Sequence, residues 1–341
     1  MHRQLAVAIE EITTMADHAE DDNDDNDGDI FVYRGGRAPQ HVTHVRIDKS
    51  IDEIENNAFC NCMQLVKVET HDGIRKIGRR AFYRCKSLRR INFKSAVEID
   101  YAAFCGCVQL VNVEFGDELE TIGGSAFAFC KALKYLKLSS FFSIGSNAFI
   151  SCSALIDIEL SERLETIDVR AFDSCVQLRR IAIPLKRDLF PFDALNEEYT
   201  QFRECEQLVT IDLVGGVQKT VASLHMESWS TEMIAEINYI NQVLPSSCAV
   251  GKTNVIRQWM ESSLDKMDHY KTEHNRYVKE GTTLLELALW KAKLGENEEH
   301  AAMERRTKKV KVDAESARKE KRIKCGAEIV IKNVLSFLRL E

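Results

Sequence analysis

Apolar and polar positions recur with a fixed period between residues 42 and 213. An Ala-Phe pair appears six times at steps of 22 or 23 residues, and each phenylalanine is followed by a cysteine after three residues and by a leucine after three more. An alternation of apolar and polar residues comes next in each copy, which predicts a short strand. The phenylalanines are Phe59, Phe82, Phe104, Phe127, Phe149 and Phe172. A period of this length indicates a solenoid built from repeated coils.

One coil is too thin to bury its own apolar side, so the copies are expected to stack with their strands parallel and with phenylalanine in the centre. The cysteine of each copy is interpreted as a small buried apolar group whose thiol donates to a backbone carbonyl of the next coil. Zinc binding is disfavoured, because Cys60 and Cys62 are two residues apart and point to different sides of a turn. The cysteines of the repeat are Cys62, Cys85, Cys107, Cys130, Cys152, Cys175 and Cys205.

The two ends of the stack carry weaker copies of the pattern. A seventh, degenerate copy keeps Phe202, Cys205 and Leu208 after a longer step of 30 residues. The extra residues fall around Pro184–Tyr199, and we expect this insertion to bulge from one rim. A strand-only copy around Val45 precedes the first full unit by the right spacing and is expected to begin the stack.

From Val217 onward the apolar residues recur at steps of three and four, which predicts helices. A first stripe from Met226 ends at Pro245, and a second stripe runs through residues 255–270. Residues 284–290 are apolar on nearly all sides, so a third helix is expected at the centre of a small bundle. A last helix is expected at residues 329–338. The final coil of a solenoid exposes an apolar end, and these helices are expected to cover it.

The charge of the chain is concentrated at its beginning. Residues 1–40 hold ten acids and three bases, which equals the whole formal net charge of −7. This composition favours a self-repelling, disordered segment. Asn23–Gly28 imitates the front of a calcium loop, but Arg34 stands where such a loop needs a bidentate Glu. The predicted parts are therefore an acidic tail (1–40), a repeat solenoid (41–216) and a helical C-terminal domain (217–341) with a charged linker at 295–324.

The repeating unit I-x-x-x-A-F-x-x-C-x-x-L-x-x-I-x-I resembles the leucine-rich repeat of the BspA-like type, the LRR type 5 family. The resemblance covers about half of the chain. It implies an α/β fold class, a leucine-rich-repeat solenoid of about seven coils of 22–23 residues with parallel strands, here followed by an all-α domain. Repeats of this type occur in bacterial surface adhesins and in proteins of microbial eukaryotes such as diatom-type microalgae. A fold of this kind does not name a ligand.

The residues between the inward positions of each strand are expected to face solvent on the concave side of the solenoid. They form two columns of mixed charge, and we expect a protein partner of unknown identity to bind there. A nucleic-acid track would need a stripe of one sign with stacking aromatics, and Tyr135 is the one aromatic residue of the columns. The candidate binding residues are Arg46, Lys67, Glu69, Arg90, Asn92, Asn112, Glu114, Tyr135, Lys137, Asp157, Glu159, Arg180 and Asp212.

Motifs for catalysis, cofactors or metals are weak in this sequence. Gly251-Lys252-Thr253 copies the end of a phosphate loop, but Ser246 stands where its first glycine is needed. His269 and His274 are five residues apart and do not match the spacing of a helical zinc site. We therefore expect no enzyme activity, no cofactor and no metal.

A second function class is suggested by the bases between residues 305 and 324. They fit both the one-part and the two-part pattern of a nuclear import signal, although seven acids are interleaved from residue 296 onward. The alternative function is thus a nuclear protein that contacts nucleic acid or an import receptor through this segment. The bases that carry the pattern are Arg305, Arg306, Lys308, Lys309, Lys311, Arg318, Lys319, Lys321 and Arg322.

Location is inferred from what the 341-residue sequence lacks. No stretch approaches the roughly 20 apolar residues that a bilayer requires, so no membrane association is expected. The first thirty residues contain no basic region followed by an apolar one, as a secretion signal would have. A cytoplasmic location, or a nuclear one if the import pattern is used, is the expectation.

Overall fold

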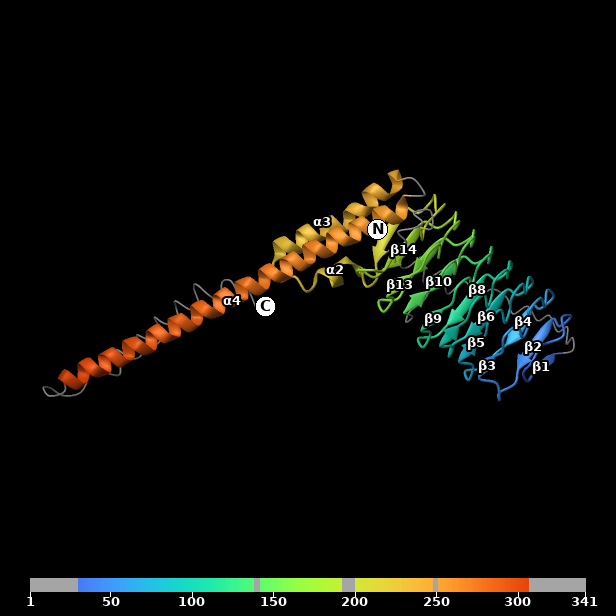
Figure 1. Cartoon of the computed structure of the whole chain (residues 1–341), viewed down its shortest axis with the longest axis horizontal. Helices are drawn as coiled ribbons and strands as arrows, with labels where there is room; N and C mark the ends of the chain where they lie inside the picture. Colours follow the sequence, from blue (N-terminus) through green and yellow to red (C-terminus); the bar gives the residue numbers. More distant parts are fainter. Residues whose placement is uncertain (1–29, 138–141, 192–199, 248–250, 307–341) are drawn as a thin grey trace, which may run out of the picture.

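The computed structural model describes residues 30–137, 142–191, 200–247 and 251–306. Figure 1 shows a stack of coils at one end of the molecule and helices at the other, with one long helix projecting away from the stack. The coils follow one another in chain order, from β1 at the outer end to β14 and β15 beside the helices.

Each coil contributes one longer strand of three or four residues, and these strands run parallel to one another. They form three sheets in the orders β1-β2-β4, β6-β8 and β10-β12-β14-β15. We call the solvent-facing side of these strands the long-strand face. The longer strands are β1 (Phe31–Tyr33), β2 (His44–Ile47), β4 (Lys67–Glu69), β6 (Arg90–Phe93), β8 (Asn112–Phe115), β10 (Tyr135–Lys137), β12 (Asp157–Glu159), β14 (Arg180–Ile183) and β15 (Thr210–Leu213).

A second wall is made of two-residue strands that pair in one six-stranded parallel sheet. Every one of these strands ends in a buried isoleucine. They are β3 (Glu53–Ile54), β5 (Lys76–Ile77), β7 (Glu98–Ile99), β9 (Thr121–Ile122), β11 (Ser143–Ile144) and β13 (Thr166–Ile167).

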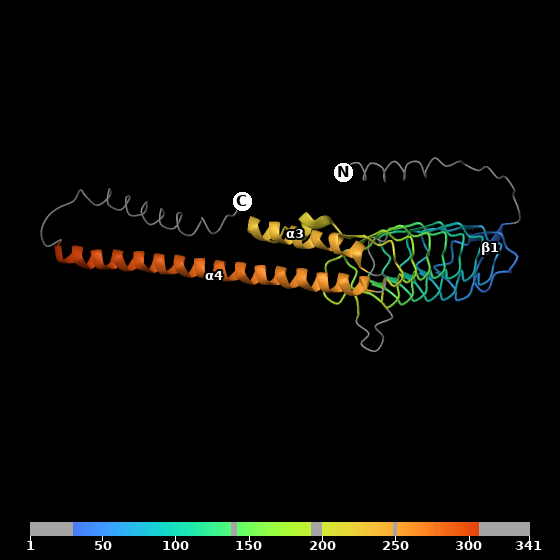
Figure 2. The same ribbon diagram turned by 90° about the horizontal axis from the view of Figure 1, so that it is seen from above.

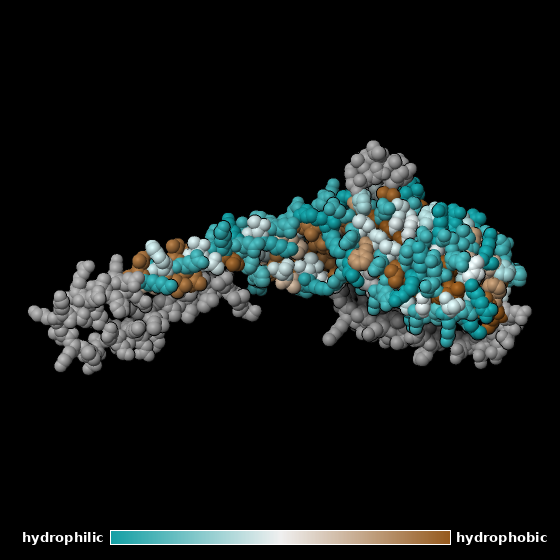
Figure 3. Space-filling view, turned by 60° about the horizontal axis from the view of Figure 1, so that its bottom comes forward, coloured by the Kyte–Doolittle hydropathy of each residue, from teal (hydrophilic) through white to brown (hydrophobic). Residues whose placement is uncertain are grey.

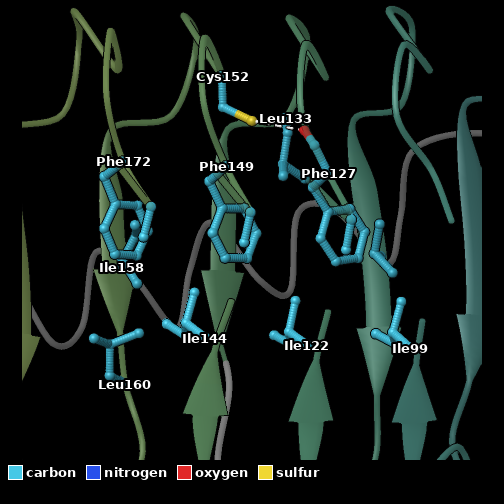
Figure 4. Close-up of a cluster of buried hydrophobic side chains, with 14 of the residues drawn as sticks. Ile99, Ile122, Phe127, Leu133, Ile144, Phe149, Cys152, Ile158, Leu160 and Phe172 are labelled. Atoms are coloured by element: carbon cyan, nitrogen blue, oxygen red, sulfur yellow. Dashed lines mark hydrogen bonds between the residues drawn. The ribbon is translucent and has the colours of Figure 1, made fainter. Parts of the chain in front are cut away.

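The core between the two walls is a column of phenyl rings. Neighbouring rings from Phe59 to Phe172 stack with centroids 5.0 to 5.3 Å apart and planes within 11° of parallel. Figure 4 shows three of these rings in one row above a row of isoleucines from the short strands. Phe202 continues the column at 5.7 Å. The predicted parallel stacking of coils with phenylalanine in the centre is confirmed.

In each of the six full coils, two residues have a left-handed backbone: one directly before the Ala-Phe pair and one two residues after the Phe. Most are not glycine, although such a backbone costs an L-residue roughly 1–2 kcal/mol. Their N–H groups donate to carbonyls of the next coil, as Arg80 does to Tyr101 at 3.0 Å and Arg84 to Cys105 at 2.8 Å. The strain at each turn is thus offset by hydrogen bonds that join the coils. The second column of such residues is Asn61, Arg84, Gly106, Phe129, Ser151, Ser174 and Glu204.

The predicted N-terminal boundary of the solenoid at residue 41 is wrong. β1 begins ten residues before this boundary and pairs in parallel with β2, so residues 31–40 are part of the stack and not of a disordered tail. Tyr33 is fully buried, and its ring lies 4.8 Å from that of Phe59. An aromatic ring that the repeat pattern does not include therefore closes the column. Residues 1–29, and the part of the predicted insertion at 192–199, lie outside the described residues.

The C-terminal part contains α2 (Gly216–Val221), α3 (Glu227–Val243), the short 3-10 helix η1 (Leu244–Ser246) and α4 (Lys252–Arg306). The stripe predicted to end at Pro245 is confirmed as α3. The second and third predicted helices are one helix, because nothing between residues 270 and 284 interrupts the backbone. The predicted linker at 295–324 is helical up to Arg306, and the last predicted helix lies outside the described residues.

The prediction that residues 284–290 lie at the centre of a bundle is wrong. α3 runs beside the first half of α4, where Trp229 stacks on Tyr270 with ring centroids 5.2 Å apart (Figures 1 and 2). Beyond Tyr277 the described helices leave α4 uncovered. The exposed apolar residues there are Leu284, Leu287, Leu289, Trp290 and Leu294. Figure 3 shows brown, apolar side chains on this part of the helix. The apolar periodicity was sufficient to predict a helix but not what it packs against.

The helices cover the last coil through hydrogen bonds as well as apolar contacts. The side-chain amide of Asn241 on α3 donates to the carbonyl of Ile211 at 3.0 Å and accepts from its N–H at 2.8 Å. At the start of α4, Lys252 donates to the carbonyls of Glu206 and Leu208. Backbone groups that a further coil would have paired are satisfied in this way.

Replacing Phe127 by Ala should lower the free energy of unfolding by about 3–5 kcal/mol, because the change opens a cavity in the centre of the ring column. Phe129, two residues away, is 46% exposed and serves as the matched control. Phe129→Asn places at this left-handed position the residue found at Asn61, and should change stability by about 0.5 kcal/mol or less. Urea denaturation of both variants measures this. Equal losses would contradict the buried column.

Replacing Asn241 by Ala should cost about 1–3 kcal/mol, because both backbone groups of Ile211 lose their partner at the edge of β15. The neighbouring Gln242 is exposed on the same helix, so Gln242→Ala is the control and should be close to neutral. Urea denaturation compares the two. A neutral Asn241→Ala would show that α3 does not cap the solenoid through this side chain.

Candidate functional site

The two columns of candidate residues lie in register across the longer strands. In the first column, Tyr135, Asp157 and Arg180 stand opposite one another on β10, β12 and β14. In the second, Lys137 stands opposite Glu159. The remaining strand pairs align the same columns: His44 with Lys67, Arg46 with Glu69, Arg90 with Asn112, Asn92 with Glu114, and Ala182 with Asp212. The structure therefore brings the candidate residues together on one face.

Exposure is not uniform along this face. Arg46, Lys67 and Arg90 near the start of the solenoid are exposed, whereas Arg180 and Asp212 are half-buried. Ala182, a member of the second column, is buried at 2% exposure. The first coils thus offer their side chains to solvent more fully than the last ones.

Charges at the start of the face neutralise one another. Arg46 donates from Nε to Glu69 at 2.6 Å, and Lys67 lies 3.5 Å from the same carboxylate. The hydrogen bond from Arg46 lowers the pKa of Glu69, with the charge of Lys67 as a smaller cause. The positive charges of Arg46 and Lys67 are therefore partly neutralised in the folded chain.

A second cluster joins three strands near the helical end. Arg180 donates from Nη1 to Asp157 at 2.8 Å and from Nε to Asp212 at 2.5 Å. Burial raises the pKa of Asp157, and the charge of Arg180 opposes that shift. One guanidinium thus holds the carboxylates of β12 and β15 across β14.

Two charged residues of the face have neither a side-chain hydrogen-bond partner nor an ion-pair partner among the described residues. They are Arg90 on β6 and Glu159 on β12, and both are exposed. Their side chains have opposite sign. The side chains of Tyr135 and Lys137, between them in chain order, lie outside what the structure describes.

The cysteines of the repeat are packing residues, as predicted, with one correction of direction. Six of the seven thiols donate to the phenylalanine carbonyl of the preceding coil and not of the next one, as Cys152 does to Phe127 at 3.1 Å (Figure 4). Cys62 donates to the carbonyl of Pro39 instead. Burial raises the pKa of Cys62 to about 11 and that of Cys152 and Cys205 to about 12. Within the described residues no group of three or more His, Cys, Asp or Glu side chains is placed to hold a metal.

The residues that imitate a phosphate loop have a structural role that the sequence did not reveal. Lys252 is 1% exposed, and burial lowers its pKa. Its ammonium group binds carbonyls of the last coil, while the hydroxyl of Thr253 accepts a hydrogen bond from the N–H of Phe202 at 3.1 Å. The side chains that would contact a phosphate are thus used to attach α4 to the solenoid.

The segment proposed as a nuclear import signal lies almost wholly outside the described residues. Arg305 and Arg306 end α4, and the other seven bases follow it. Import through this segment stays a prediction, as does the cytoplasmic location. Among the helices that the structure describes, none has an apolar stretch long enough to cross a bilayer.

Comparison with known proteins identifies the repeat. Residues 38–99 and 94–196 match the BspA type leucine rich repeat region, with six copies. No curated protein matches the chain.

Several solved structures of bacterial leucine-rich repeat proteins resemble the chain. A leucine-rich repeat protein from Bacteroides ovatus is 24% identical over 50% of this chain and 41% of its own, with a TM-score of 0.41. A leucine rich repeat protein from T. pallidum is 25% identical over 53% of this chain and 72% of its own, with a TM-score of 0.35. A leucine rich cell surface protein from Faecalibacterium prausnitzii is 20% identical over 51% and 61%, with a TM-score of 0.35. The chain thus spans less than half the length of the Bacteroides protein.

Alkylation should distinguish packed from accessible thiols. In native protein at pH 8, iodoacetamide should label Cys60 and Cys105, which are half-buried, and leave the seven buried thiols unlabelled until the chain unfolds. Burial and the raised pKa both suppress the reactive thiolate of the buried residues. Mass spectrometry of tryptic peptides measures labelling at each site. Labelling of Cys152 in the native protein as fast as that of Cys60 would contradict the packing.

Proposed function

We propose that this chain, whose residues 38–196 form a BspA-type leucine-rich repeat region, is a non-enzymatic scaffold that binds another protein on the concave face of its solenoid, formed by the longer strands. Leucine-rich repeat proteins are generally protein-interaction scaffolds and are typically not enzymes.

The observation that carries this proposal is the register of the two columns. Eight longer strands from β2 to β15 place side chains of mixed charge at regular spacing, and seven intervals of about 4.8 Å make a face roughly 33 Å long. A specific protein interface needs about 800 Å² on each partner, which a face of this length can supply. Rigid parallel strands hold the side chains in place before a partner arrives, so little conformational entropy is lost on binding.

The ion pairs on the face indicate which residues a partner would use. Glu69 and Arg180 already have partners, whereas Arg90 and Glu159 do not. β6 and β12 are three strand positions apart, about 14 Å at 4.8 Å per strand. We therefore expect the partner to present an acid and a base at about this separation, because complementary charges set register and orientation at an interface.

The test uses a photoreactive amino acid in the full chain. p-Benzoylphenylalanine at Asn112, on β8 between the two unpaired charges, should cross-link a protein in an extract of the source cells. The same residue at Glu120, which is exposed just before the short strand β9, is the matched control and should give little product. The double variant Arg90→Glu with Glu159→Lys should lower the yield from Asn112 at least tenfold, with an unchanged melting temperature. Equal cross-link yields at positions 112 and 120 would contradict the proposed face. So would a yield at position 112 that is unchanged in the double variant.

A further inference from the structure

One coil of the solenoid is far more basic than its neighbours. Residues 79–90, which run from the end of β5 around the turn to the start of β6, contain six bases and no acid. All six are exposed. We call this set the basic coil: Arg79, Arg80, Arg84, Lys86, Arg89 and Arg90.

The bases of this coil have no acidic partner among the residues that the structure describes. The two bases just before it do: Arg75 pairs with Glu118, and Lys76 lies 3.2 Å from Glu98. The acids of the following coils thus neutralise Arg75 and Lys76 but not the six bases of the basic coil. Six unpaired positive charges in one place create a field that attracts an anion.

Aromatic rings hold three of these arginines in place. The guanidinium carbons of Arg80 and Arg84 lie 5.5 and 5.1 Å from the centre of the Tyr83 ring. That of Arg79 lies 4.9 Å from the centre of the Tyr101 ring, on the next coil. Stacking of this kind limits the freedom of the arginine side chains while leaving their N–H groups open to a ligand.

The backbone contributes to the same arrangement. Arg80 and Arg84 both have the left-handed backbone of the turn, with φ of 53° and 57°. On the next coil the position equivalent to Arg84 is Gly106, where a Cβ atom would lie 3.2 Å from Cγ of Arg84. The absence of a side chain at Gly106 leaves room for the stem of Arg84.

The shape of the basic coil selects among anions. The equivalent turn positions on the preceding coil, Asn56, Asn57 and Asn61, and on the next one, Ala102 and Gly106, are uncharged. The basic strip is therefore one coil wide, about 5 Å along the solenoid. A nucleic-acid duplex spreads its phosphates over a much wider surface. A single extended peptide with closely spaced carboxylates fits, because arginine binds carboxylates in a bidentate manner.

This chain contains such a peptide. Residues 17–29 hold eight acids and no Lys or Arg, and they join the described chain immediately before β1. β1 and β6 are separated by three strand intervals, about 14 Å. Thirteen extended residues span up to about 43 Å, so the acidic segment can reach the basic coil. Its attachment to the solenoid gives it a high effective concentration at that surface.

We propose that the basic coil is a binding site for acidic peptide segments, and that residues 17–29 of the same chain occupy it when no partner is bound. An external acidic protein must then displace the chain's own segment. This site is separate from the partner site of the long-strand face, with which it shares only Arg90, so either can exist without the other.

Zero-length cross-linking of the full chain tests the occupant. A carbodiimide joins carboxylates directly to amines, and Lys86 is the one lysine of the basic coil. In low salt, peptide mapping should find Lys86 joined to an acid of residues 17–29 within one chain. In 0.5 M NaCl the yield should fall at least fivefold, because salt screens exposed charges. A link from Lys86 to another region, a link between two chains, or no link would overturn the intramolecular occupant.

Matched variants test the arginines. Arg80→Asn with Arg84→Asn introduces the residues that the preceding coil has at the same turn positions, Asn57 and Asn61, so the fold should be kept, as thermal unfolding would verify. This variant should lower the Lys86 cross-link at least fivefold. Lys131→Ala with Lys134→Ala removes two exposed bases from another coil and should leave it unchanged. An equal effect of both variants would reduce the contact to general electrostatics and overturn the site.

Binding in trans tests the ligand class. The ligand is a fluorescent peptide with the unchanged sequence of residues 17–29, and the variant is the full chain with six aspartates of that segment replaced by Asn. The peptide should bind the variant at least tenfold more tightly than the original chain, because the internal competitor is then removed. The replaced residues of the full chain are Asp21, Asp22, Asp24, Asp25, Asp27 and Asp29. Tighter binding of a single-stranded RNA of similar length to the same variant would show that the coil is a nucleic-acid site and overturn the proposal. Equal peptide affinities before and after the change would overturn it as well.

Discussion

The structure depends on the fact that one coil cannot bury its own interior. Each coil brings one phenyl ring to the centre, and that ring is covered only by the rings of the coils before and after it, about 5 Å away. The same neighbours supply the hydrogen-bond partners of the left-handed turn residues. The free energy of folding therefore resides in the contacts between coils, as expected for a solenoid. The exposed columns of the long-strand face are held in register by the same contacts.

A stack of this kind has two ends, and the chain closes them differently. At the first coil, the buried ring of Tyr33 covers the column. At the last coil, side chains from helices do so, with Asn241 and Lys252 binding the backbone groups that lack a further strand. α4 then continues well past the region that α3 covers and carries an exposed apolar surface around Trp290. The helical part thus both ends the solenoid and extends away from it.

The sequence predicted those features that the period determines. Residues that occupy the same place in successive copies must share a column, so the phenyl stack, the parallel strands and the alignment of Arg90 with Asn112 followed from spacing alone. Features that depend on contacts outside the period were missed. β1 lacks the Ala-Phe and cysteine signals, and the uncovered half of α4 has the same apolar pattern as a buried helix. The sequence shows that Lys67 is positively charged, but it does not show that Glu69 on the same strand lies 3.5 Å away and partly neutralises that charge. The stacking of Arg84 on Tyr83 also depends on turn geometry that no spacing rule specifies.

Hydrogen exchange along the solenoid tests most directly the claim that the coils stabilise one another. The amides of Phe82, Phe104 and Phe127 each donate to a carbonyl of the next coil at 2.7–2.8 Å. If stability resides between coils, these amides should exchange only through cooperative opening of several adjacent coils, with similar protection in the middle of the stack and lower protection toward its ends. Independent exchange of single coils, with the Phe104 amide as fast as exposed turn residues, would contradict the account.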